Sequence, residues 1–314
     1  MKTNKNHQEF LRRSGQGCIC CNSFNLKKSY GLVSPFFAER ALALKDTFVL
    51  DVLFCKECGT RFFDINVSDL ALQNLYADYR GESYFRQRNR LEPWYTKAVN
   101  DSLGNEEEFA ERRKVCVEAL AAAHIKNDFK SVLDHGGDKG QMLAQTDQFG
   151  IKALRRAVYE ISGIQTDSGV ESVSYDDLPK TKWDLILSCH VLEHLPNPSE
   201  YISNLVELGE KGTIYFFEVP NEQYKTFNFN GSSIQLMWMK WVIKFPSLLR
   251  LFYFLSSGVR IKLGFVLPFL FPVMVEHLNY FSVDGMVRLC ETKGLNVKYS
   301  AVGSAGHIVV VAVK

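Results

Sequence analysis

The sequence predicts an α/β fold built on a doubly wound parallel sheet, because strand-like and helix-like segments alternate in its central part. Four apolar stretches are predicted as strands of this sheet: residues 131–135, 156–161, 183–188 and 212–219. A helix is predicted over Pro198–Leu208, between the last two strands. The first strand ends in a glycine-rich turn, Gly136 to Gly140, and a helix is predicted after it. In such sheets the ligand site lies at the carboxyl ends of the strands.

Composition and charge narrow the range of functions. The chain has 314 residues, 46% of them hydrophobic, which excludes intrinsic disorder and coiled coil as overall descriptions. Its 37 basic and 35 acidic residues give a net charge of +2 and no reason to expect a nucleic-acid binder. Residues 223–275 nevertheless contain six basic residues and no acidic one, so the rest of the chain sums to −4.

The chain shows no secretory signal and no segment that is expected to span a membrane. Residues 1–17 are polar and lack the apolar core of a signal peptide. The longest uncharged apolar run, Leu263–Val275, has 13 residues and two prolines, which is too short for a membrane-spanning helix. We expect a cytoplasmic protein, with peripheral contact at the inner face of the membrane through residues 234–275 as a further expectation.

Four of the eight cysteines form two Cys-x-x-Cys pairs, Cys18 with Cys21 and Cys55 with Cys58. Each such turn directs two thiolates to one point, and two turns complete the tetrahedral site that zinc prefers. Four cysteine ligands leave no open position, so the predicted zinc is structural, with Cys20 as an alternative ligand in the first pair. Four buried free thiols are the other interpretation, which the repeated spacing disfavours.

The N-terminal part is predicted to hold a small module and a helical lobe. The predicted strands and helices are Phe48–Phe54, Arg61–Ile65, Ser68–Tyr79 and Asn105–Lys126. Residues 1–66 are therefore expected to form a β-rich zinc-binding module, too small to be stable without its metal. Residues 67–127 are expected to form a helical linker before the sheet.

Acidic residues end the first two strands of the predicted sheet. Asp134 precedes the glycine-rich turn, and Glu160 ends the next strand 26 residues later. The turn presents backbone amides to a ligand, and a carboxylate at the tip of the second strand can accept both hydroxyls of a ribose. The sequence therefore predicts a nucleoside-containing cofactor at this edge of the sheet.

The most specific motif is the block His190-Val-Leu-Glu-His-Leu-Pro-Asn-Pro198. With Val-Leu-Asp134-x-Gly136 and Glu160, it resembles class I S-adenosylmethionine-dependent methyltransferases over roughly residues 110–314. The resemblance implies a Rossmann-like, seven-stranded, mostly parallel sheet and S-adenosylmethionine as the cofactor. Residues 128–219 and 282–314 are then the cofactor-binding core.

The resemblance also implies which residues hold the cofactor. Asp134 and the glycine-rich turn would cradle the methionine part of the cofactor, and Glu160 would hold its ribose. Asp176 or Asp177 would lie near the adenine, and His190 would line the pocket beside the sulfonium. The implied set is Asp134, Gly136, Gly137, Gly140, Glu160, Asp176 and His190. One departure is Asp138, which stands where the family has its middle glycine; Gly137 can take up the special backbone angles instead.

The C-terminal segment is predicted as a hairpin of two strands, Gly294–Ala301 and His307–Val313. A terminal antiparallel hairpin completes the sheet of that family, which makes residues 220–281 an insertion. Within the insertion, apolar residues at intervals of three and four predict a helix that Pro246 kinks or divides. We expect this helical segment to be a lid on the acceptor side. A cationic aromatic face against a membrane or an anionic substrate, such as a sugar-linked diphosphate, is the alternative.

The segment Glu276-His277-Leu-Asn-Tyr-Phe-Ser282, with the four-cysteine module, resembles zinc-containing sugar methyltransferases. In the C-methylating members the pattern is Tyr-His-Glu-His before Tyr-Phe-Ser, and the last His with its Glu abstracts a proton. Met274 and Val275 replace the first two residues of that pattern. His277, tuned by Glu276, is therefore the expected base, and Tyr79 is matched to a tyrosine of the family.

The expected function is O-methylation of a sugar of a bacterial surface polysaccharide or its nucleotide-linked precursor. A weakly nucleophilic sugar hydroxyl needs a base within hydrogen-bond distance, which His277 supplies. C-methylation of a keto-deoxysugar is the alternative, disfavoured because the enolate oxygen needs donors that the altered motif has lost. A non-catalytic zinc protein that holds the cofactor, or recognises RNA, is the further alternative; charge disfavours RNA. The oligomeric state is left open.

Overall fold

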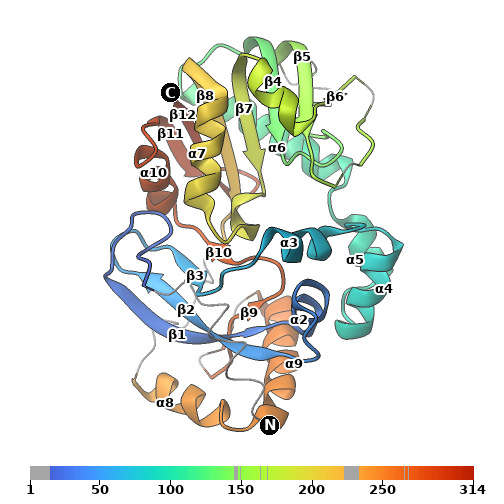
Figure 1. Cartoon of the computed structure of the whole chain (residues 1–314), viewed down its shortest axis with the longest axis vertical. Helices are drawn as coiled ribbons and strands as arrows, with labels where there is room; N and C mark the ends of the chain where they lie inside the picture. Colours follow the sequence, from blue (N-terminus) through green and yellow to red (C-terminus); the bar gives the residue numbers. More distant parts are fainter. Residues whose placement is uncertain are drawn as a thin grey trace. The chain divides into compact units, whose positions relative to one another are not determined.

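The computed structural model describes residues 15–144, 148, 150–162, 164–167, 169–222, 233–264, 266–267 and 269–314. The chain divides into two compact units (Figure 1). Unit 1 contains Asn22–Asn100 and Glu222–Tyr280, and unit 2 contains Asp101–Asn221 and Phe281–Lys314. No helix in the described part of the chain is both long enough and apolar enough to cross a membrane.

Unit 2 is built on a seven-stranded sheet with the order β11-β12-β8-β7-β4-β5-β6. In chain order its strands are β4 (Asp128–His135), β5 (Lys152–Tyr159), β6 (Glu171–Ser172), β7 (Trp183–Cys189), β8 (Gly209–Pro220), β11 (Asn296–Val302) and β12 (His307–Val313). Neighbouring strands along the series β6-β5-β4-β7-β8 are all parallel, and β12 is antiparallel to both β8 and β11. The predicted C-terminal hairpin is therefore observed, at the edge of the sheet.

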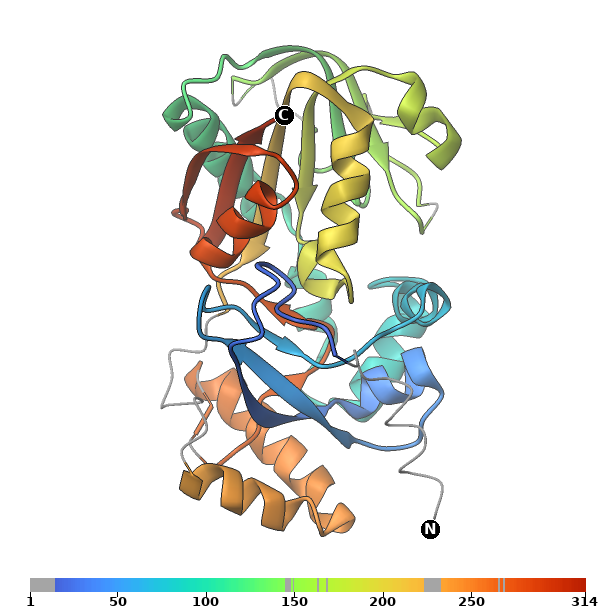
Figure 2. The same ribbon diagram turned by 60° about the vertical axis from the view of Figure 1, so that its left-hand side comes forward.

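Among the described residues, three α-helices pack with this sheet: α6 (Glu106–Ala122), α7 (Pro198–Leu208) and α10 (Val283–Glu291). Figure 2 shows α7 running along one face of the sheet. The side chain of Asn105 caps α6 by accepting from Glu108 N at 2.9 Å. Asn197 caps α7 in the same way, and Pro198 stands at the first helical position, where its missing N–H costs nothing. Local capping thus explains why these predicted helices begin where they do.

Unit 1 is built on a five-stranded mixed sheet with the order β10-β3-β2-β1-β9. Its strands are β1 (Leu26–Val33), β2 (Phe48–Cys55), β3 (Arg61–Phe63), β9 (Val273–Met274) and β10 (Asn279–Tyr280). The sequence predicts separate modules over residues 1–66 and 220–281, whereas in the structure both segments contribute strands to one sheet. The physical reason is that β1 and β3 each pair with a strand of the later segment, β9 and β10 respectively, which no local pattern reveals.

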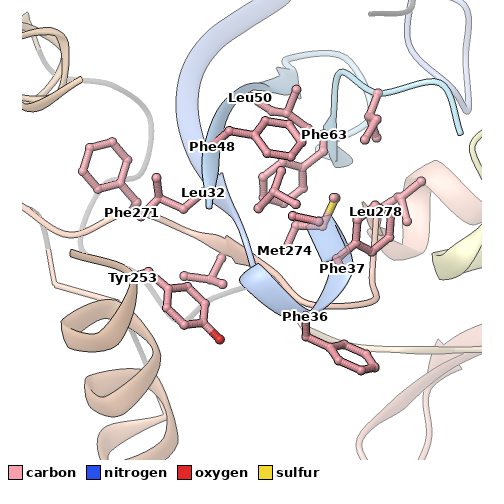
Figure 3. Close-up of a cluster of buried hydrophobic side chains, with 14 of the residues drawn as sticks. Leu32, Phe36, Phe37, Phe48, Leu50, Phe63, Tyr253, Phe271, Met274 and Leu278 are labelled. Carbon is pink, nitrogen blue, oxygen red and sulfur yellow. The ribbon is translucent and has the colours of Figure 1, made fainter. Parts of the chain in front are cut away.

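The helices of unit 1 pack into one core with this sheet. They are α2 (Pro35–Leu42), α3 (Asp69–Tyr76), α4 (Glu82–Leu91), α8 (Ser233–Val242) and α9 (Pro246–Leu263), and α5 (Lys97–Ser102) follows α4. Figure 3 shows the core residues gathered from both parts of the chain, with Phe36 and Leu50 from the N-terminal part and Tyr253, Phe271 and Met274 from the later part. The two parts of the chain therefore share one buried apolar core, which makes them a single folding unit.

Of the two forms predicted for the helix of the insertion, kinked or divided, the structure shows the divided one. The helix of the insertion divides into α8 and α9 at Pro246, which begins α9, because proline lacks the N–H that a continuous helix requires. The helix predicted after the glycine-rich turn is not seen in the described residues 137–144, which form turns. The residues that would continue it include 145–147 and 149, which lie outside the described part.

Candidate active site

The glycine-rich turn of unit 2 follows β4 and is shaped around the Asp134 side chain. Asp134 is fully buried, and a Cβ on Gly137 would lie 2.3 Å from its Oδ2 atom, so position 137 requires glycine. Gly136 and Gly140 have φ angles of +79° and +84°, which side-chain-bearing residues rarely adopt. Each of the three predicted glycines therefore has a structural reason to be glycine.

Asp138 itself takes the left-handed backbone conformation, with φ of +53°. The expectation that Gly137 would take up this angle is wrong. Aspartate adopts this conformation more readily than most residues, and the Asp138 N–H donates to Glu160 Oε2 at 3.1 Å. The substitution of the family's middle glycine is therefore accommodated by a bond to the acidic residue that ends the next strand.

The Asp134 carboxylate is a buried group without an internal partner. Neither oxygen has a hydrogen-bond partner among the described residues. Burial raises its pKa to about 7, and the nearby charge of Arg112 only partly opposes this. Because an unpaired buried carboxylate is costly, a ligand that brings a positively charged donor would be bound favourably here.

Glu160 follows β5 and lies beside the glycine-rich turn. Its Oε1 accepts from Ser162 N at 3.0 Å, and its Oε2 accepts from Asp138 N. These bonds fix the carboxylate, which retains lone pairs for further donors. Asp176 is placed in the short 3-10 helix Tyr175–Lys180, which follows β6.

His190 follows β7 and belongs to a network that the sequence did not reveal. Its Nε2 lies 3.1 Å from His307 Nδ1, and the same His307 nitrogen lies 2.9 Å from Glu218 Oε1. The second oxygen of Glu218 accepts from Arg112 Nη2 at 2.8 Å. Burial opposes ionisation of Glu218, but the charge of Arg112 and the bond to His307 outweigh it and lower its pKa to about 2.

This network lies at the carboxyl ends of the parallel strands. Glu218 is near the end of β8, and His307 begins the antiparallel β12, opposite Pro220. Arg112 is on α6, 106 residues before Glu218. The atoms of His190, Glu218 and His307 are close enough to share a metal ion. The sequence marked His190 through its motif, but it carried no signal for Glu218 and His307, which come from distant segments.

Glu276 and His277, the predicted catalytic residues, lie between β9 and β10 in unit 1. Glu276 accepts hydrogen bonds from Tyr84 and, at 3.1 Å, from Arg88 Nη1, both on α4. Burial raises the pKa of Glu276 to about 7, although the charges of His277 and Arg80 act in the opposite direction. The structure therefore surrounds Glu276 with hydrogen-bond donors from α4, which sequence reasoning missed.

His277 Nδ1 is hydrogen-bonded to Glu222 Oε2 at 2.8 Å, and Glu222 Oε1 pairs with Arg260 at 3.1 Å. The sequence motif predicts Glu276 alone as the acid that tunes His277. The structure adds Glu222, 55 residues away, as an acid in direct hydrogen-bond contact. No motif marked Glu222, which stands at the start of the insertion.

Tyr79 is buried in an aromatic cluster of unit 1. Its ring packs edge-on against Tyr84, with ring centroids 5.3 Å apart. Burial and the charge of Glu276 both raise the pKa of Tyr79 above its ordinary value. The structure thus brings the three predicted catalytic residues into one region of unit 1, around α4 and the β9–β10 connection.

The four predicted cysteine ligands converge. The sulfur atoms of Cys18, Cys21, Cys55 and Cys58 all lie within 4.8 Å of one another. The Cys18 and Cys58 sulfurs are 3.5 Å apart, which is close to the spacing of thiolates around a tetrahedral zinc ion. The donor set therefore fits zinc, whereas Cys20 does not belong to this group.

A seven-stranded α/β sheet with a glycine-rich turn after its first strand defines a ligand-binding enzyme core of the doubly wound class. The chain matches the "Methyltransferase domain" family over residues 107–300, which is more than half of its length. The chain therefore belongs to this family. None of the curated proteins compared with it matches.

Solved structures of methyltransferases resemble parts of the chain. Human N-acetylserotonin methyltransferase in complex with SAM is 12% identical, with a TM-score of 0.41, and the match covers 77% of this chain and 58% of that one. The mitomycin 7-O-methyltransferase MmcR is 17% identical, with a TM-score of 0.40 and coverage of 73% and 60%. An S-adenosylmethionine-dependent methyltransferase from Mesorhizobium loti is 11% identical, with a TM-score of 0.39 and coverage of 64% and 98%. The match thus spans less than two thirds of the first two proteins, and the assignment stands on the family match.

Proposed function

We propose that the chain transfers the methyl group of S-adenosylmethionine to a hydroxyl of a sugar, in a surface polysaccharide or a nucleotide-linked precursor. The cofactor assignment rests on the Asp134 carboxylate, which is buried beside a glycine-rich turn and has no hydrogen-bond partner within the described part of the chain. When bound, S-adenosylmethionine supplies a methyl group that is already activated on sulfur. The chain then has to hold the cofactor and the acceptor and exclude water.

The surroundings of Asp134 and Glu160 support the roles that we propose for them, and the roles of the other cofactor residues are part of the same proposal. Asp134 accepts from the ammonium group of the methionine part, which supplies the partner that the carboxylate lacks. Glu160, already fixed by two backbone N–H groups, accepts from the ribose hydroxyls. Asp176 lies near the adenine, and His190 lines the pocket beside the sulfonium.

On the acceptor side we propose that His277 takes the proton of the attacking hydroxyl. Its Nδ1–H donates to Glu222, and this bond holds the ring and favours the tautomer in which Nε2 is basic. Glu276 and Tyr79 position the acceptor through the hydrogen-bonded cluster around α4. The sugar specificity rests on the motif around Glu276 and on the cysteine module.

The cysteine module is proposed to hold a structural zinc ion. Three of the four cysteines are buried and the fourth is half-buried, so a bound ion is shielded from solvent. Four thiolates complete the coordination of zinc, so the ion stabilises the turns before β1 and between β2 and β3 and takes no part in the chemistry.

C-methylation of a keto-deoxysugar is a second candidate that one observation favours. The altered motif lacks two polar groups, but Tyr84 and Arg88 bring donors to Glu276 from α4. The Arg88 guanidinium has further N–H groups, which could stabilise the enolate oxygen that forms when an α-proton is removed. A C-methylating enzyme would exchange the α-proton of a ketosugar with deuterium in heavy water, whereas an O-methylating enzyme would not.

The proposal is tested in two stages. Calorimetry of the full chain with S-adenosylmethionine and with its demethylated product should show binding, and an absence of both heat and thermal shift would refute the cofactor assignment. Mass spectrometry of nucleotide sugars and glycan termini incubated with enzyme and cofactor should then show a mass gain of one methyl group. Methylation of small aromatic alcohols but of no sugar would overturn the proposed substrate class.

A further inference from the structure

The outer face of α8 in unit 1 is an exposed apolar surface for which the proposed function has no use. Ile234, Met237 and Trp241 follow at intervals of three and four residues and share one side of the helix, and Phe245 continues the row past its end. Their side chains are 67%, 67%, 48% and 42% exposed, in that order. The opposite side of α8 is buried in the unit: Gln235, Met239 and Val242. We call the four exposed residues the α8 outer face.

The aromatic members of the α8 outer face are held in place. Trp241 stacks on Trp238, with ring centroids 5.3 Å apart, and contacts Phe245 at 5.0 Å. The Trp238 indole N–H donates to the Phe269 backbone oxygen at 3.1 Å. Phe269 itself is 55% exposed, so it extends the apolar surface beside the helix. Large exposed apolar groups that are braced in this way indicate a binding surface rather than scattered surface residues.

Basic side chains flank the α8 outer face. Lys240 and Lys244 line a shallow surface depression together with Met237 and Trp241. No acidic residue occurs anywhere between residues 223 and 275, although the segment carries six basic ones. The surface therefore combines exposed apolar groups with the positive charges of Lys240 and Lys244, in a segment that has an excess of basic residues.

Charge decides which occupant fits this surface. A second copy of the chain would bring two sets of basic residues together, which is unfavourable. A bilayer of anionic lipids offers phosphates for the lysines and an acyl boundary for tryptophan, methionine and isoleucine. We propose that the α8 outer face binds the surface of an anionic phospholipid membrane, with Trp241 and Met237 at the boundary between headgroups and acyl chains.

The test uses the full chain and sedimentation with vesicles. One set is pure phosphatidylcholine, and the other contains equal parts of phosphatidylcholine and phosphatidylglycerol. The chain should sediment with the anionic vesicles, less so at high salt, and weakly with the neutral ones. The apolar variant Met237→Ser with Trp241→Ser should lower the partition coefficient about tenfold or more. The charge variant Lys240→Glu with Lys244→Glu should lower it by a similar factor.

Matched controls change the same chemistry elsewhere. Leu154→Ser removes a leucine that is 88% exposed on β5, and Lys114→Glu reverses an exposed charge on α6. Both should bind vesicles like the unaltered chain, and circular dichroism should show all variants folded. Equal binding by all variants, or no sedimentation of the unaltered chain, would overturn the proposal. The proposal would equally be overturned if the unaltered chain were a dimer that does not bind vesicles and the Met237→Ser, Trp241→Ser variant were a monomer. That result would identify a second copy of the chain as the occupant of the α8 outer face.

Discussion

The change Asp134→Asn should stabilise the cofactor-free protein at alkaline pH while weakening its binding of cofactor. Burial raises the pKa of Asp134 from its ordinary value of 3.8 to about 7. A tenfold change in an ionisation equilibrium corresponds to about 1.36 kcal/mol. Ionising Asp134 in the folded protein above pH 7 therefore reduces the free energy of unfolding by about 4 kcal/mol. Asparagine removes this cost but buries an amide without partners, which costs about 1–3 kcal/mol. The expected net gain at pH 8 is therefore about 1–3 kcal/mol.

The stability difference between Asp134→Asn and the unaltered protein should depend on pH, and this dependence is a sharper test than the gain at pH 8. Between pH 4 and pH 7 the folded protein keeps a proton on Asp134 that the unfolded chain releases, so raising the pH through this window destabilises the unaltered protein. The advantage of Asp134→Asn should grow by about 1.36 kcal/mol for each pH unit in the window. The melting temperature of Asp134→Asn should therefore rise relative to that of the unaltered protein by roughly 5–10 °C between pH 5 and pH 7, for a domain of the size of unit 2.

The assay is a thermal melt at several pH values, with calorimetry at pH 8 for cofactor affinity. Loss of a charge-assisted hydrogen bond should weaken S-adenosylmethionine binding about 10- to 100-fold. The matched control is Asp184→Asn on β7, whose carboxylate accepts from Lys130 N at 2.6 Å and Ser131 N at 3.1 Å. That variant should be no more stable than the unaltered protein at any pH. A pH-independent difference for Asp134→Asn, with unchanged cofactor affinity, would refute the reasoning.

Three further predictions concern the base, the metal and the buried ion pair. His277→Gln should lower turnover about 10²- to 10⁴-fold in steady-state assays without changing the Kd for S-adenosylmethionine, and retained turnover would contradict the proposed base. Cys58→Ser should lose bound zinc by elemental analysis and melt at a lower temperature, whereas Cys290→Ser, a buried cysteine of α10, should keep its zinc. Arg112→Met should cost about 3–5 kcal/mol, because the buried Glu218 carboxylate would lose its cationic partner and retain its bond to His307, and adding Glu218→Gln should recover part of the loss. The pKa of Glu218 is lowered to about 2, so the ionised Glu218 carboxylate should contribute to the free energy of unfolding at neutral pH. This contribution should disappear as pH falls from about 4.5 to 2.

Local sequence signals predicted much of the secondary structure because they act within a few residues. The helix Pro198–Leu208 and the strand His307–Val313 are observed with the predicted bounds, since a capping asparagine, a first-turn proline and a run of β-branched residues act locally. The two Cys-x-x-Cys turns likewise converge as their spacing predicts. Pro246 divides the helical segment of the insertion, which is one of the two alternatives that the sequence predicts, a kinked helix being the other.

Tertiary structure alone decided which distant residues meet. Glu222 bonds His277, and Arg112 pairs with Glu218, because strand pairing and helix packing join segments 55 and 106 residues apart. In the same way, β9 and β10 complete the sheet begun by β1–β3, so the presumed insertion shares the core of the N-terminal module. The sequence by itself determined the methyltransferase core and its glycine-rich turn, whose patterns are local. The partners of the buried charges depend on which strands lie side by side, and no periodicity within one segment encodes that.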